Sequence, residues 1–200
     1  MKTEQDVRRL GGAVAALVAL SHLLLGASRL LTDPEANNLW QAFLQGPGVG
    51  RYLLLVIALL LLAVLPAVEA LFEGVRAQAG WLSQVALLGI FATVLARVQD
   101  ANVSVLFYSV DAQGWLGVGC LVTWAAGVGL LAWRRKVLPA WLCLAALAWA
   151  GLLAGALVAG MFWNDGLVRT LLLLTCFAAA PAWFGGLAGV LLRGDGESGR

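Results

Sequence analysis

Six apolar stretches, separated by short polar segments, make up most of this 200-residue chain. Each is about as long as the ~20 residues that an α-helix needs to cross the ~30 Å hydrocarbon core of a bilayer. Backbone N–H and C=O groups in lipid must pair internally, so these stretches form either helices or a closed β-barrel. The stretches are residues 11–31, 52–72, 80–98, 115–133, 137–163 and 167–192.

The second stretch decides between helices and a barrel. Residues 53–62 read LLLVIALLLL, without the alternation of polar and apolar positions that a barrel strand shows. The pattern therefore predicts an all-α, polytopic transmembrane bundle of six spans. We expect a single membrane domain over residues 1–193 and a disordered polar tail over residues 194–200.

Basic residues predict the orientation of this bundle, because Lys and Arg are retained on the cytoplasmic side of a membrane. With the N-terminus inside, nine basic residues flank the inner ends of the spans and four flank the outer ends. The sequence RRK at 134–136 carries much of this difference. Both termini are therefore predicted to be cytoplasmic. We expect a multi-pass protein of the inner (plasma) membrane.

Composition excludes several classes of function. Hydrophobic residues make up 62% of the chain and charged residues 12%, and the net charge of +2 is too small and too dispersed for a nucleic-acid partner. One histidine cannot build a multi-histidine metal site or a bis-histidine haem site. The three cysteines form no CxxC pair. We expect no catalytic residue, no metal and no cofactor.

The segment between the first two spans contains a helix signal of its own. Thr32 or Asp33 can cap a helix, Pro34 suits its first turn, and apolar residues follow at i,i+4 spacing until Gly46. The sequence predicts a short amphipathic helix in the outer interface. It either caps a cavity in the bundle or lies on its surface.

Five polar residues fall between the middle of the membrane and its outer surface in this topology. His22 lies midway along the first span, with Arg29 seven residues later on the same face, and Thr93, Arg97 and Asp100 share a face of the third. Ionisable residues inside spans often mark functional sites. These five are the candidate ligand-binding residues, in one outward-facing polar cavity.

A structural interpretation of the same residues stays open. Arg29, Arg97 and Asp100 lie near helix ends, where long side chains can reach water. His22 can bond a neighbouring backbone carbonyl.

Glycine and proline predict details of packing. Gly151 with Gly155, and Gly185 with Gly189, have the GxxxG spacing that lets membrane helices approach closely. Two prolines are expected to kink or locally open the second and sixth spans, and these are Pro66 and Pro181.

The layout resembles a family of six-helix bacterial inner-membrane proteins of unknown function. The resemblance rests on RLGGA at residues 9–13, the longer first outer segment, and RRKVLPAW at residues 134–141. It implies a bacterial membrane protein and no particular activity.

Three functions remain open from the sequence. The first is a non-enzymatic membrane component that binds lipid, a protein partner or a second copy of itself. The second is a small-solute or proton-coupled transporter that uses the outer polar residues. The third is a membrane-embedded enzyme acting on lipid, which the scarcity of acid–base groups disfavours.

Overall fold

The computed structural model describes residues 2–31, 49–72, 75–100, 107–162 and 165–193, which are helical apart from short turns. Five segments are long and apolar enough to cross a bilayer, and α3 has a shorter apolar part, Leu53–Glu69. The predicted all-α bundle is confirmed for this part of the chain. In order, the elements are α1 (Lys2–Leu31), α3 (Val49–Glu69), α4 (Arg76–Asp100), α5 (Phe107–Arg135), α6 (Ala140–Met161), α7 (Asp165–Leu174), the π-helix η2 (Thr175–Ala179) and α8 (Ala180–Arg193).

Two predicted features lie outside the described residues. These are the short interfacial helix in the segment 32–45 and the polar tail over residues 194–200.

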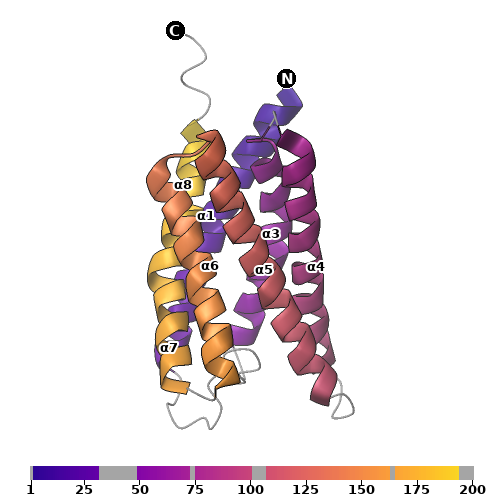
Figure 1. The fold of residues 1–200 in the computed structure, drawn as a ribbon, viewed down its shortest axis with the longest axis vertical. Coiled ribbons are helices and arrows are strands. Elements are labelled where there is room, and N and C mark those ends of the chain that lie inside the picture. Colours follow the sequence, from indigo (N-terminus) through magenta and orange to yellow (C-terminus); the bar gives the residue numbers. More distant parts are fainter. Residues whose placement is uncertain (1, 32–48, 73–74, 101–106, 163–164, 194–200) are drawn as a thin grey trace.

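The helices run side by side along the long axis of the molecule (Figure 1). The start of α1 and the end of α8 lie at the same end, called here the terminal end. Helix α1 packs against α3 and α8, α4 packs against α3 and α5, and α6 packs against α5, α7 and α8. Because successive segments alternate in direction, the α5–α6 turn also lies at the terminal end.

The α5–α6 turn has a defined backbone geometry. Lys136 has a φ of 55°, a left-handed conformation that is unusual outside glycine. Val137 N–H donates to the Ala132 carbonyl at 3.2 Å, which is the Schellman bond that closes a helix C-terminus. Pro139 then stands at the N-cap of α6. Helix α5 therefore ends sharply, with Arg134 and Arg135 in its last turn.

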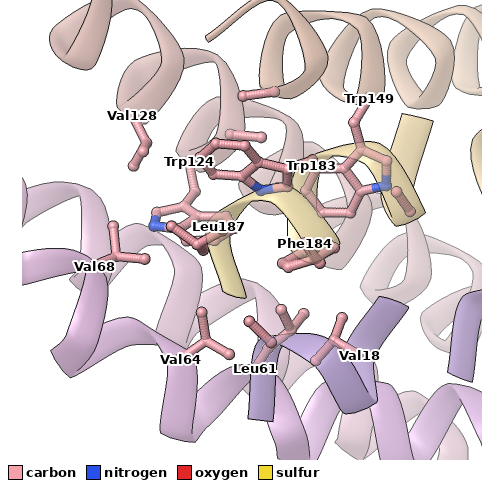
Figure 2. Packing of buried hydrophobic residues seen from close by; sticks show 14 of the residues in the cluster. Val18, Leu61, Val64, Val68, Trp124, Val128, Trp149, Trp183, Phe184 and Leu187 are labelled. Carbon is pink, nitrogen blue, oxygen red and sulfur yellow. The ribbon is translucent and has the colours of Figure 1, made fainter. Parts of the chain in front are cut away.

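Aromatic rings fill the middle of the bundle. Trp149 and Phe184 lie edge to face at 5.2 Å between ring centroids, and Trp124 meets Trp149 at 6.5 Å. Trp183 completes this aromatic core, and all four side chains are buried. Figure 2 shows the rings between the α5–α6 side of the bundle and the α1–α3 side. Such pairs add about 0.5–1.5 kcal/mol each beyond the area that they bury.

Of the four glycines in the predicted pairs, Gly155 of α6 lies at a close helix contact, because a Cβ there would lie 3.3 Å from Leu171 Cδ1 of α7. A Cβ at Gly151, Gly185 or Gly189 would meet no described atom within 4 Å, so the predicted close approach is wrong at these three. A Cβ at Gly89 of α4 would lie 2.6 Å from the Cys120 Cβ and 2.9 Å from the Gly117 carbonyl oxygen of α5. The α4–α5 contact therefore depends on glycine.

The predicted opening of the sixth segment is confirmed at Pro181. Proline has no N–H to donate to the carbonyl four residues earlier, which here is that of Phe177. The helix forms a π turn over Thr175–Ala179, in which Ala180 N–H donates to the carbonyl of Thr175. The other proline, Pro66, lies inside α3, which continues as an α-helix to Glu69.

Candidate functional site

His22 of α1 is buried at the edge of the aromatic core. Its ring stacks on Phe184 with centroids 5.6 Å apart and planes 19° apart, and it meets Trp149 edge to face at 6.2 Å. His22 Nδ1 lies 2.9 Å from the carbonyl oxygen of Val18. A carbonyl only accepts, so Nδ1 carries the proton, and in the neutral ring Nε2 is left as an acceptor.

A cavity of about 90 Å³ lies beside this ring, on the side of the aromatic core away from the terminal end. We call it the His22 cavity. Its walls come from α1, α3, α4, α5, α6 and η2, and most of them are aliphatic. The polar or sulfur-bearing side chains in the lining are His22, Thr93, Trp149, Thr175 and Cys176.

The two threonines have already used their hydrogens. Thr93 Oγ1 donates to the Gly89 carbonyl at 2.8 Å, and Thr175 Oγ1 donates to the Leu171 carbonyl at 2.8 Å. Each hydroxyl keeps lone pairs as acceptors. Together with Nε2 of His22, they make the polar part of the cavity rich in acceptors.

One donor balances these acceptors. The indole N–H of Trp149 has no hydrogen-bond partner among the described residues, although the side chain is only 2% exposed. A buried donor left in this state costs about 1–3 kcal/mol. A ligand oxygen in the His22 cavity that accepted from Trp149 would remove that cost.

The structure brings together two of the five predicted site residues. His22 and Thr93 line the same cavity although they are 71 positions apart in sequence. The side chains of Arg29, Arg97 and Asp100 lie outside the described part of the chain. The hydrogen bond from His22 to the Val18 carbonyl is also what we expect if His22 has only a structural role.

Sequence reasoning missed Trp149, Thr175 and Cys176 as lining residues. Pro181 was the available signal for the last two. The π turn that it requires includes both Thr175 and Cys176, and π turns are frequent at functional sites.

Metal binding finds no support in the described residues. They contain no group of three His, Cys, Asp or Glu side chains placed to hold an ion. The side chains of Cys120, Cys143 and Cys176 are buried.

Comparison with known proteins adds no relative. No protein-family model matches this chain, and neither does any curated protein or solved structure. The apolar helices alone indicate a membrane protein.

Proposed function

We propose that this chain is a non-enzymatic component of the bacterial plasma membrane that binds lipid. Its ligand is an uncharged, lipid-soluble molecule whose hydroxyl group enters the His22 cavity. The observation that carries the proposal is the arrangement of acceptors and one donor around that cavity. A protein partner and a second copy of the chain are the other binding functions that the sequence allows.

The chemistry of the cavity defines this ligand. A hydroxyl can donate to Nε2 of His22 or to a threonine oxygen while its own oxygen accepts from Trp149. The described lining contains no carboxylate, Lys or Arg, so a charged group would lose its hydration without gaining a counter-ion. The aliphatic remainder of the wall suits a hydrocarbon body.

Size limits what fits. Pockets for drug-sized ligands occupy about 300–1,000 Å³, whereas the His22 cavity measures about 90 Å³. The cavity therefore suits the polar end of a larger lipid, with the rest of that lipid between the helices or in the bilayer.

Transport is the alternative that would use the same residues. A solute passing from the His22 cavity to the terminal end would have to cross the aromatic core, where Trp124, Trp183 and Phe184 are each 0% exposed. Passage would require these rings to separate. Closed packing at this level favours binding over passage.

The predicted orientation agrees with the placement of the helices. Both described chain ends lie at the terminal end (Figure 1). The α5–α6 turn, with the basic cluster Arg134, Arg135 and Lys136, lies at the same end. We propose that this end is cytoplasmic, which puts the His22 cavity in the outer half of the membrane.

Native mass spectrometry of the protein released gently from its own membranes tests this function. The expected result is one bound lipid species that is lost from His22→Phe, which keeps a ring against Phe184 but removes both nitrogens. Thr93→Val is expected to lower its occupancy about five-fold, since one net hydrogen bond contributes about 1 kcal/mol.

Thr123 provides the matched control for that variant. Its hydroxyl donates to the Gly119 carbonyl at 2.9 Å, as Thr93 donates to Gly89, but Thr123 is exposed and does not line the cavity. Thr123→Val should retain the lipid. Retention by all three variants, or a persistent second polypeptide in place of a lipid, would overturn the proposal.

A further inference from the structure

A second hollow lies on the outside of the bundle, between α4 and α5 at the terminal end. We call it the Arg134 groove; its volume is about 470 Å³. Gln78 and Trp81 of α4 form one wall, and Leu130 and Arg134 of α5 form the other. Gly127 lies deeper in it, and the absence of a side chain there lets Leu82 pack onto α5.

The groove changes from polar to apolar along its length. Arg134 and Gln78 lie nearest the terminal end, Trp81 and Leu130 come next, and Gly127 is deepest. From Arg134 to Gly127 is seven residues of helix, or about 10 Å of depth. Trp81 is 60% exposed. Tryptophan is enriched at the headgroup level of membranes, which is where this end of α4 would place the indole.

Charge separates this groove from a similar hollow between α3 and α4. The α3–α4 hollow has a volume of about 520 Å³, and only aliphatic and aromatic side chains line it, among them Leu62, Leu88 and Phe91. Any acyl chain can fill it. The Arg134 groove adds an exposed guanidinium at its mouth, which makes no ion pair with any described residue.

We infer that the Arg134 groove binds one anionic glycerophospholipid from the cytoplasmic leaflet. The phosphate lies against the guanidinium of Arg134, which can bind it through two parallel hydrogen bonds. Gln78 and the Trp81 indole lie at the level of the glycerol, and one acyl chain follows Leu130 toward Gly127. This site is separate from the His22 cavity and does not depend on a ligand there.

Charge complementarity supports this occupant over a neutral lipid. Arg135 and Lys136 adjoin Arg134, and the left-handed turn at Lys136 keeps all three at the end of α5. Basic clusters at the cytoplasmic ends of spans attract anionic headgroups, and a Lys or Arg that lies against the headgroup strengthens binding about five-fold, here Arg134.

Lipid retention on the full chain tests the inference. The protein is delipidated in a neutral detergent and then titrated with phosphatidylglycerol or phosphatidylcholine, and native mass spectrometry counts the bound lipids. We expect one phosphatidylglycerol to be retained at least five-fold more strongly than phosphatidylcholine. Arg134→Gln should remove most of that preference.

Arg135→Gln is the matched control, because Arg135 is also exposed and lies in the same turn but does not line the groove. It should change retention by less than about two-fold, the residual effect of a nearby surface charge. Equal effects of the two variants would overturn the inference, as would equal retention of both lipids. Displacement by free glycerol phosphate would also overturn it, because a headgroup ion would then suffice without an acyl chain.

Discussion

Replacing Gly89 with alanine tests how the wall of the His22 cavity is held in place. Gly89 lies one helical turn before Thr93 on α4, where α4 meets α5. A methyl group at Gly89 would lie 2.6 Å from the Cys120 Cβ and 2.9 Å from the Gly117 carbonyl oxygen. Carbon atoms prefer separations of about 3.5–4.0 Å. Neither neighbour is a flexible side-chain end, so the two helices must separate by about 1 Å.

Two opposing effects determine how much Gly89→Ala changes the free energy of unfolding. Overpacking of this kind costs about 1–3 kcal/mol. Any replacement of glycine by alanine inside a helix also gains up to about 1 kcal/mol of helix propensity. Gly119→Ala isolates the second term, because a Cβ at Gly119 of α5 meets no described atom within 4 Å. The two variants should therefore differ by about 1–3 kcal/mol, with Gly89→Ala less stable.

Reversible unfolding in mixed micelles measures this difference. Sodium dodecyl sulfate is titrated into the protein in a non-ionic detergent, and tryptophan fluorescence follows the loss of the aromatic core. Equal unfolding midpoints for Gly89→Ala and Gly119→Ala would refute the reasoning, because the α4–α5 contact would then tolerate a methyl group. If Gly89→Ala is destabilised and also binds less of the lipid that is lost from His22→Phe, this contact holds the His22 cavity in place.

Two further predictions concern the sixth segment and the orientation. Pro181→Ala restores an N–H that can donate to the Phe177 carbonyl, so amide exchange across η2 should slow about five-fold, as for one regained hydrogen bond of about 1 kcal/mol; unchanged exchange would separate the π turn from Pro181. A fluorescent protein fused after Arg200 should fold and fluoresce in the cytoplasm, whereas alkaline phosphatase at the same position should be inactive. Active phosphatase there would reverse the proposed orientation.

The sequence predicted the helices well because lipid imposes one simple rule. Every backbone group in the hydrocarbon core must be paired within its own segment, so apolar length alone predicts a helix. The first predicted span began at residue 11, whereas α1 begins at Lys2, because helical pairing can continue into water where apolar character ends. Polar residues such as Lys2 therefore belong to the helix without belonging to its apolar span, Gln5–Ser28.

The rotation of each helix could not be predicted in the same way. Lipid is as apolar as the core, so the hydrophobic pattern does not separate inner from outer faces as it does in water. The GxxxG spacing shows that Gly151 and Gly155 share a face, but it does not show whether that face meets a helix. Gly89 and Gly117 lie on two different helices, so the spacing of residues within either helix does not predict their contact.

His22 and Thr93 illustrate what topology can add to such a pattern. Alternating spans place both residues in the same half of the membrane, which limited their separation before any contact was known. Their meeting at one cavity depends on the packing of α1, α3, α4 and α5, which only the structure supplies. Trp149 lines the same cavity, and its unpartnered N–H is likewise a property of that packing.

Insertion into lipid and binding of a ligand place opposing demands on the same polar groups. A membrane span must satisfy its hydrogen donors before any ligand arrives, since an unsatisfied group in hydrocarbon costs several kcal/mol. His22, Thr93 and Thr175 each meet this demand by donating to a carbonyl of their own segment, which leaves their acceptor lone pairs for a ligand. Trp149 has no such bond within the described residues, and it lines the cavity, unlike Trp124 and Trp183, whose N–H groups are also unpartnered. It is therefore the cavity group that gains most from a bound oxygen. A Trp149→Phe variant would then remove the hydrogen bond that contributes most to ligand binding, while the helices would still insert into the membrane.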